Sequence, residues 1–303
     1  MIDFQPFDIH NKSAYDQFLQ NSGERGCEYS FVNLYLWGRQ RAAFLKDHLV
    51  FFSQFDRKSV YPFPVGTDDK KPVLDAIIQD AKERGIPCRL TGLTQDDCAL
   101  LEKLYPGKLR YHFDRNSFDY VYDINDLADL KGKKFQKKRN HLNRFRAENP
   151  DHLLQPITRE NIHLVENLVM KWYDLRRQSD PHADFHMEQA ALKKALTQYD
   201  LLGLEGLVLY VAGEPVAMTI GSRLNPNTFD VHFEKALDIA DGAYPAINNG
   251  FARYLREKYP DVQFLNREDD MGLEGLRKAK LSYNPHHMVE KSWAHLLEDG
   301  YDY

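Results

Sequence analysis

The segment TFDVHFEKA, residues 228–236, carries side chains that can exchange protons at every second position. In a β-strand, Asp230, His232 and Glu234 would share one face, and the intervening phenylalanines and valine would form an apolar face that we expect to be buried. A solvent-facing strand explains the polar face without any chemistry. In a cleft, His232 or Glu234 could instead remove the proton of an attacking amine, as acyl transfer requires, with Asp230 beside them contacting substrate.

A second polar group follows the expected strand VQFLN and precedes a short expected helix, in NREDDMGLEGLRKAKLSYNP. Carboxylates in this place favour the positive end of a helix, and this accounts for them without a ligand. Alternatively, Glu268 or Asp270, together with Asn266, could hold the ammonium group of an amino-acid moiety. The helix then carries Arg277 and Lys280, whose cations could reach a phosphate or carboxylate of the substrate.

The third feature is a basic segment, residues 131–146, with eight lysines or arginines and no acid in a chain of net charge −5. On a helix, its two phenylalanines and leucine would face the protein body and the cations would face outward. A solvated helix usually mixes both signs, because like charges one turn apart repel. We therefore expect a phosphate-binding surface, for which the candidate residues are Lys133, Lys137, Lys138, Asn140 and Arg144.

The composition limits the possible classes of protein. With 303 residues and 43% hydrophobic content, the chain can form two ordinary domains. A pI near 6.2 argues against a general nucleic-acid coat protein. No secretory pattern or membrane-length apolar run is visible, so we expect a cytoplasmic protein without a transmembrane segment. Three scattered cysteines indicate packing roles, and HADFH (His182, His186) lacks a further ligand cluster, so we expect no metal site.

The order of the expected elements repeats along the chain. Each half contains a hairpin, a strand, a long helix, a strand, a short helix and a final strand. The hairpins turn near Lys46-Asp47 and Gly213-Glu214, and the final strands are SFDYVYD and HHMVEKSWA. This order predicts two copies of one α/β unit, which we divide into residues 1–130 and 131–303.

Three stretches carry a closer resemblance: FQKKRNHLNRF, DVHFEKALDIADGAYPAINNGFARYL and LNREDDMGLEGLRKAKLSYNP. They resemble the C-terminal domain family of phosphatidylglycerol lysyltransferases, which also occurs as free-standing soluble proteins. The resemblance implies an α/β (α+β) fold made by tandem duplication of a GNAT-like acyltransferase unit, with mixed central sheets flanked by helices. The architecture is similar to that of Fem-type aminoacyl transferases. It also implies that Tyr283 is the acid that protonates the leaving group.

One departure concerns the donor. GNAT enzymes that use acetyl-CoA carry a Q/R-x-x-G-x-G/A loop that binds pyrophosphate at a helix N-terminus. Here the equivalent stretch, DIADGAYPAIN, retains Gly242 alone, and Pro245 removes a backbone donor. The pattern disfavours ordinary acetyl-CoA binding. It favours aminoacyl transfer and, equally, a binding protein that has lost the reaction.

The sequence therefore predicts an acyl- or aminoacyl-transferase with no tightly bound cofactor. Its donor would be a phosphate-bearing acyl-CoA or aminoacyl-tRNA, and its acceptor a small molecule, a peptide or a lipid head group. Two other classes remain open: a non-catalytic ligand-binding protein that retains the fold, and an RNA-binding module that uses the basic segment.

Overall fold

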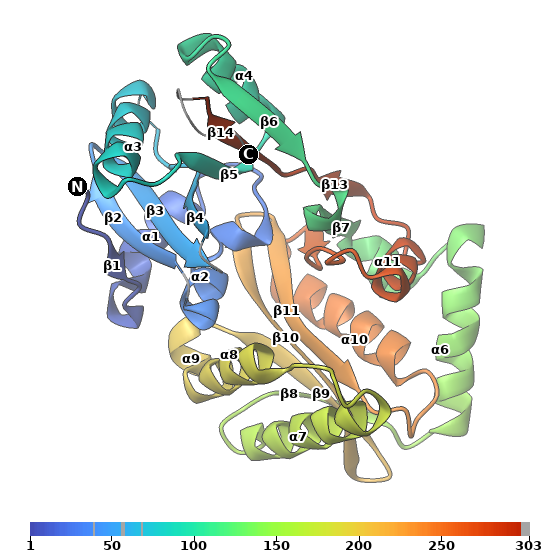
Figure 1. The fold of residues 1–303 in the computed structure, drawn as a ribbon. Coiled ribbons are helices and arrows are strands. Elements are labelled where there is room, and N and C mark those ends of the chain that lie inside the picture. Colours follow the sequence, from blue (N-terminus) through green and yellow to red (C-terminus); the bar gives the residue numbers. More distant parts are fainter. Residues whose placement is uncertain (39, 56–57, 68, 298–303) are drawn as a thin grey trace. The chain divides into compact units, whose positions relative to one another are not determined.

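The computed structural model describes residues 1–38, 40–55, 58–67 and 69–297, which form two compact units. The first unit contains residues 1–119, 269–273 and the C-terminal residues from 288, and the second contains residues 120–268 and 274–287. Each unit is built on a mixed β-sheet with helices packed against it (Figure 1).

The sheet of the first unit has the order β1-β2-β3-β4-β5-β14-β6. Strands β4 and β5 are parallel, whereas β14 is antiparallel to both of its neighbours, β5 and β6. The β2–β3 hairpin turns at Lys46 and Asp47, both with positive φ, as the sequence predicted. The strands are β1 (Gln5–Pro6), β2 (Gln40–Leu45), β3 (His48–Phe55), β4 (Lys58–Pro62), β5 (Arg89–Leu93), β6 (Leu109–Phe113) and β14 (Ser292–Leu296).

The helices of this unit begin and end where local residues dictate. Helix α3 (Lys71–Arg84) has Pro72 in its first turn and ends at Gly85, whose φ is 67°. Helix α4 (Gln95–Leu104) begins with a capping box between Thr94 and Asp97. Apolar residues of α3, α4 and the sheet form the core of the unit. The shorter helices are α1 (Lys12–Leu19) and α2 (Phe31–Trp37).

The sheet of the second unit has the order β13-β7-β12-β11-β10-β9-β8. The central strand β11 is antiparallel to β10 and parallel to β12. Helix α10 packs against strands β9, β10 and β11, and α7 packs against β10 and β11 (Figure 1). The strands are β7 (Asp119–Asp123), β8 (Leu153–Pro156), β9 (Glu205–Val211), β10 (Glu214–Asn225), β11 (Thr228–Ala236), β12 (Phe264–Asn266) and β13 (His287–Val289).

The helices of the second unit are α5 (Ile124–Asp129), α6 (Gln136–Glu148), α7 (Ile162–Ser179), α8 (His186–Thr197), α9 (Tyr199–Leu202), α10 (Ala243–Lys258) and α11 (Glu274–Leu281). The basic segment forms α6 together with a preceding 3-10 turn, Lys133–Phe135. Phe135, Leu142 and Phe145 are buried, as the amphipathic pattern predicted. Gly242, with φ 88°, lies against the Phe145 side chain, where a Cβ atom would come within 2.8 Å.

Three expected elements differ from the structure. The hairpin between β9 and β10 turns at Ala212 and Gly213 rather than at Gly213-Glu214. The strand SFDYVYD, assigned to the first half, is β7 and pairs with β12 in the second sheet. The segment HHMVEKSWA forms two strands, and the second of them, β14, lies in the first sheet. The compact units are therefore not the continuous halves 1–130 and 131–303, because hydrogen-bond partners distant in sequence decide which sheet a strand joins.

Candidate functional site

The strand β11 does not keep the strict alternation expected from its sequence. Its pairing with β10 skips one residue: Ile220 lies opposite Phe233, whereas Gly221 lies opposite Val231. This β-bulge at His232 reverses the direction of the side chains that follow it. Phe229 and Glu234 consequently both contact helix α10, although five positions apart they would point to opposite faces of a regular strand.

The bulge divides the predicted residues into two groups, both within the second unit. The first group contains Asp230, His232 and Glu268, whose ligating atoms all lie within 4.8 Å of one another. His232 Nδ1 is 3.4 Å from the Asp230 carboxylate and 3.6 Å from that of Glu268. On the other side of the ring, Nε2 is 2.7 Å from the hydroxyl oxygen of Ser222. The His232 and Asp230 side chains are buried, and that of Glu268 is 27% exposed.

Asn266 holds this first group in place. It ends strand β12 directly beside Asp230 on β11, and its side-chain oxygen accepts a hydrogen bond from the Glu268 N–H at 2.7 Å. Glu268 has a positive φ of 58°, which non-glycine residues rarely adopt. The buried amide of Asn266 therefore supports an unusual turn that brings the Glu268 carboxylate to His232.

The second group contains Glu234, Arg267, Tyr283 and Lys138. The Arg267 guanidinium donates to the Glu234 carboxylate at 2.8 Å and lies 5.2 Å from the centre of the Tyr283 ring. The Lys138 ammonium lies over the same ring, 3.9 Å from its centre. Asn248 on α10 donates a longer hydrogen bond to Glu234. Two cations, a carboxylate and a phenol thus lie together where β11, β12, α6 and the end of α11 meet.

Burial shifts the protonation equilibria of this second group. It raises the pKa of Tyr283 to about 12, so the phenol keeps its proton at neutral pH. Burial, together with the charges of Arg267 and Lys137, lowers the pKa of Lys138 to about 8. Burial disfavours the charge of Arg267, but the Glu234 carboxylate and the neighbouring phenols of Tyr122 and Tyr283 together outweigh it, and the pKa of Arg267 is raised.

The remaining cationic candidates have various surroundings. Lys133, Lys137 and Asn140 are exposed, which agrees with the outward face expected for the basic segment. Arg144 is also exposed and pairs with Asp241. Among these candidates, Lys138 is the one that contacts Tyr283. Their proposed contact with a phosphate stays a prediction.

The substrate-binding candidates outside the two groups are placed differently. The Lys280 ammonium is buried and donates to the backbone carbonyls of Arg267 and Glu268, so it fixes the chain after β12. Arg277, on α11, is half-buried. Asp270 belongs to the first unit, where its buried carboxylate accepts from the Gly272 N–H and lies 3.6 Å from Arg115. Whether any of them contacts a substrate stays a prediction.

Sequence reasoning missed Arg267 and Ser222. Arg267 stands inside the quoted NREDD run, and its position directly after a strand end was the available signal. No pattern in the sequence pointed to Ser222, because its contact with His232 arises from the pairing of β10 with β11.

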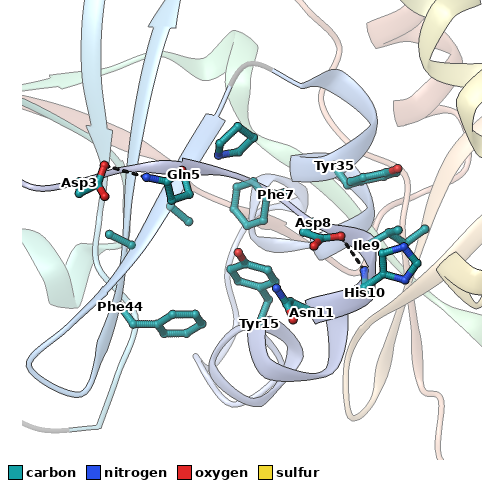
Figure 2. A pocket seen from close by; sticks show the side chains of 13 residues that line it. Asp3, Gln5, Phe7, Asp8, Ile9, His10, Asn11, Tyr15, Tyr35 and Phe44 are labelled. Atoms are coloured by element: carbon teal, nitrogen blue, oxygen red, sulfur yellow. Dashed lines mark hydrogen bonds between the residues drawn. The ribbon is translucent and has the colours of Figure 1, made fainter.

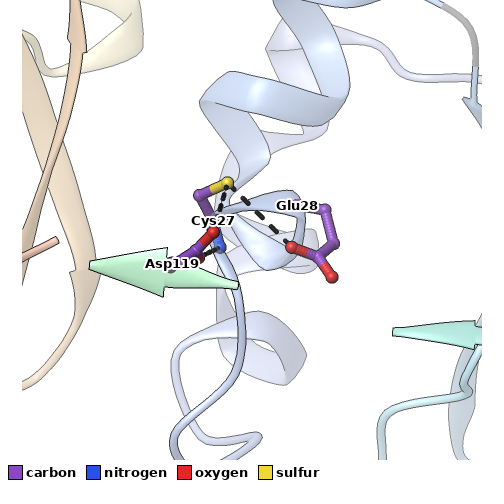
Figure 3. A group of neighbouring side chains, drawn as sticks. All are labelled: Cys27, Glu28 and Asp119. Carbon is purple, nitrogen blue, oxygen red and sulfur yellow. Dashed lines mark hydrogen bonds between the residues drawn. The ribbon is translucent and has the colours of Figure 1, made fainter. Parts of the chain in front are cut away.

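The first unit contains two further candidates, a cavity and a group of polar side chains. A cavity of about 810 Å³ is lined by aromatic and acidic side chains, among them Phe7, Asp8, Tyr15 and Tyr35 (Figure 2). Cys27, Glu28 and Asp119 form a compact group in which the thiol lies between two carboxylates (Figure 3). The Lys291 ammonium donates to both carboxylates of this group, at 2.7 Å and 2.9 Å.

Comparison with known protein families identifies the chain. The family described as phosphatidylglycerol lysyltransferase, C-terminal, matches residues 19–295, which is most of the sequence. The chain belongs to this family. The family membership expected from the sequence is thus confirmed.

Individual members and structures give the same picture. A conserved protein of unknown function from Bacteroides thetaiotaomicron is 40% identical, with a TM-score of 0.93 over 98% of this chain and 100% of the other. L-PGS from Bacillus licheniformis is 16% identical, and its structure has a TM-score of 0.71 over 98% of this chain and 94% of the other.

More distant structures show the fold. FemX is 11% identical with a TM-score of 0.60, over 98% of each chain. A tandem GNAT protein from the clavulanic acid biosynthesis pathway is 10% identical with a TM-score of 0.51, over 98% of this chain and 99% of that one. The expected tandem GNAT-like fold, with two mixed sheets flanked by helices, is confirmed.

An uncharacterized protein of Mycoplasmoides gallisepticum is 26% identical over 178 residues, 58% of this chain and 55% of the other. The chain therefore spans about half the length of this curated relative. Among the described residues, none of the helices has the length and apolar character needed to span a bilayer.

Proposed function

We propose that the second unit transfers an aminoacyl or acyl group from a phosphate-bearing donor to an amine or hydroxyl acceptor. The observation that carries this proposal is the group Glu234–Arg267–Tyr283–Lys138, which combines a proton acceptor, a fixed cation and a neutral phenol. The similarity in fold to L-PGS, FemX and a tandem GNAT protein supports it.

Each residue of this group has a role in the proposed reaction. The acceptor attacks the carbonyl carbon of the donor while its proton passes to the Glu234 carboxylate. The Arg267 guanidinium stabilises the negative charge that develops on the carbonyl oxygen. As the bond to the leaving group breaks, Tyr283 gives its proton to the departing oxygen or sulfur and regains one from solvent. The raised pKa of Tyr283 ensures that this proton is present.

Lys138 and the exposed cations of α6 bind the donor. Lys138 lies over the Tyr283 ring, so a phosphate held by its ammonium would be close to the reacting bond. The absence of the glycine-rich loop around Gly242 and the presence of Pro245 favour an aminoacyl-tRNA over an acyl-CoA. The acceptor would be a small molecule, a peptide or a lipid head group.

Donor turnover tests the proposal. We would incubate the protein with labelled aminoacyl-tRNAs and, separately, with acyl-CoAs, and measure loss of the acyl group with and without amine acceptors. We expect Tyr283→Phe to lower the turnover rate by about 100-fold or more, the usual range for loss of a general acid, without weakening donor binding. Tyr254→Phe, which removes a hydroxyl bonded to Glu205 in the same unit, is the matched control.

Two outcomes would count against catalysis. Donor binding without turnover by the wild-type protein would identify a non-catalytic binding protein that keeps the fold. Equal binding of charged and uncharged RNAs, lost in moderate salt and dependent on Lys137, would instead identify an RNA-binding module.

A further inference from the structure

We propose that Asp230, His232 and Glu268 bind a divalent transition-metal ion. These residues form a group separate from Glu234, Arg267, Tyr283 and Lys138, because the bulge in β11 turns Glu234 away from it. The inference goes beyond the proposed transferase reaction and does not depend on it. From the sequence we expected no metal site, but that expectation considered His182 and His186 and not His232.

The hydrogen bonding of the imidazole is the first argument. His232 Nε2 lies 2.7 Å from Ser222 Oγ, within the range of a hydrogen bond. The His232 side chain is buried, with 1% of its surface exposed, and yet Nδ1 makes no hydrogen bond to any residue that the structure describes. If Nε2–H donates to Ser222, Nδ1 presents a lone pair on the side of two carboxylates. A cation between the three groups would remove this repulsion. A hydrogen bond from the second ring nitrogen also fixes the ring of a metal-bound histidine, usually to a carboxylate, a backbone carbonyl or water, and here Ser222 takes that place.

The separation of the ligating atoms is the second argument. Zinc binds imidazole nitrogen and carboxylate oxygen at about 2.0–2.2 Å, so two ligands of a tetrahedral site lie about 3.4 Å apart. The Nδ1–Asp230 and Nδ1–Glu268 distances are 3.4 Å and 3.6 Å. One nitrogen and two carboxylate ligands with a fourth position open suit zinc or manganese better than magnesium, which requires octahedral oxygen ligands.

The group of Cys27, Glu28 and Asp119 in the first unit has a similar composition, but a lysine of the protein binds its two carboxylates. There the Lys291 ammonium lies 2.7 Å from Asp119 and 2.9 Å from Glu28 (the latter two are drawn in Figure 3), so it supplies the positive charge that a metal would bring. The neighbouring carboxylates raise the pKa of Lys291 well above its ordinary value despite its burial. This group carries no metal proposal and serves as the control.

The proposal assigns His232 a role different from the proton transfer predicted from its sequence context. As a ligand through Nδ1, it would join the bulge of β11 to the turn after β12, where Glu268 stands. Glu268 is 27% exposed, which leaves one side of the ion accessible to solvent or to an anionic group of a bound molecule.

Metal binding by the full chain tests the inference directly. The protein would be stripped with a chelator and titrated with Zn²⁺, Mn²⁺ and Mg²⁺ by calorimetry, and Co²⁺ would be added to follow its visible absorption. We expect one Zn²⁺ per chain, weak or no Mg²⁺ binding, and the intense bands of four-coordinate Co²⁺. Glu268→Gln should weaken Zn²⁺ binding by at least about 100-fold, the upper end of the cost of losing an outer-shell partner. Asp230→Asn provides a second ligand variant should Glu268→Gln fold poorly.

Glu28→Gln is the matched control, because it changes a carboxylate in the group that Lys291 occupies, and it should leave the affinity for Zn²⁺ unchanged. Equal Zn²⁺ affinity in the wild-type protein and in folded Glu268→Gln or Asp230→Asn would place the ion on surface histidines and overturn the proposal. Failure of the stripped wild-type protein to bind Zn²⁺ or Mn²⁺ would overturn it as well. Neither result depends on whether the protein is a transferase.

Discussion

Lys138 shows how a single residue of the basic segment differs from its neighbours. Lys137 beside it is exposed, whereas Lys138 is half-buried against the Tyr283 ring with the Arg267 guanidinium on the same ring. Burial and this second cation lower the pKa of Lys138 to about 8. A lysine with such a pKa can bind an anion at neutral pH and release it in mildly alkaline solution.

Replacing Lys138 with methionine should therefore alter stability in a pH-dependent way. Below pH 8 the folded protein holds an ammonium that burial and Arg267 disfavour, so Lys138→Met should raise the free energy of unfolding. We expect an increase of only about 1 kcal/mol, because solvent screens the half-buried ammonium and the Tyr283 ring offsets part of the penalty. The unfolded chain binds more protons between pH 8 and the ordinary lysine pKa of 10.5, so the wild-type protein gains stability there and the difference disappears.

Chemical denaturation at pH 7 and at pH values up to about 10 measures this difference. Lys137→Met, which removes an exposed neighbouring charge, should show no comparable pH dependence. If Lys138→Met gained as little stability at pH 7 as Lys137→Met, Lys138 would have an ordinary pKa, and its assigned position against Tyr283 would be wrong.

At the scale of elements, the bulge in β11 and the packing of α6 on α10 arrange the candidate groups. The bulge sends Asp230 and Glu234 to different neighbours. Helix α6 reaches Tyr283 because its buried Phe145 rests on the backbone at Gly242, immediately before α10. Gly242, the one glycine that remains from the phosphate-binding pattern, thus has a structural reason to be glycine.

Gly242→Ala should separate the two helices. The new methyl group would lie 2.8 Å from Phe145 Cβ and 3.3 Å from the His141 carbonyl oxygen, in a backbone conformation with φ 88°. The strain and overpacking should lower the free energy of unfolding by about 2–4 kcal/mol. Gly275→Ala, in helix α11 with no atom within 4 Å of the new methyl group, should be neutral or stabilise by up to about 1 kcal/mol. Equal effects of the two substitutions in thermal denaturation would contradict the packing described for α6.

At the scale of the whole chain, each sheet is completed by a segment distant in sequence. Strand β14 lies between β5 and β6 in the first sheet, although nearly 180 residues of chain separate it from β6. Strand β7 follows the first run of elements and yet pairs with β12 in the second sheet. The first unit therefore cannot be excised as a continuous piece.

A fragment of residues 1–130 should not fold cooperatively. Without β14, strand β6 loses its partner in the sheet, strand β5 keeps only β4, and the buried Ala294 is missing from the core. We expect no cooperative thermal transition and little dispersion in an amide NMR spectrum of this fragment, whereas a chain ending at residue 297 should retain both. A sharp unfolding transition of the 1–130 fragment would show that β14 is dispensable.

The sequence by itself determined the features that neighbouring residues specify. The Lys46-Asp47 turn and the buried face of α6 were predicted from the sequence. The start and end of α3 and the capping box of α4 are set in the same way by adjacent residues, because caps, turns and helical periodicity act over a few residues. The three stretches that carry the resemblance, above all the one with NREDD, predicted the family and hence the fold, and the match over residues 19–295 confirms the family.

Only the tertiary structure decided which of the polar residues meet. The pairing of β10 with β11 produced the bulge, brought Ser222 to His232 and separated Glu234 from Asp230. The approach of α6 selected Lys138 among the eight cations of the basic segment. Strand partners and side-chain contacts join residues tens or hundreds of positions apart, and their energies depend on distance and burial, which no local pattern in the sequence records.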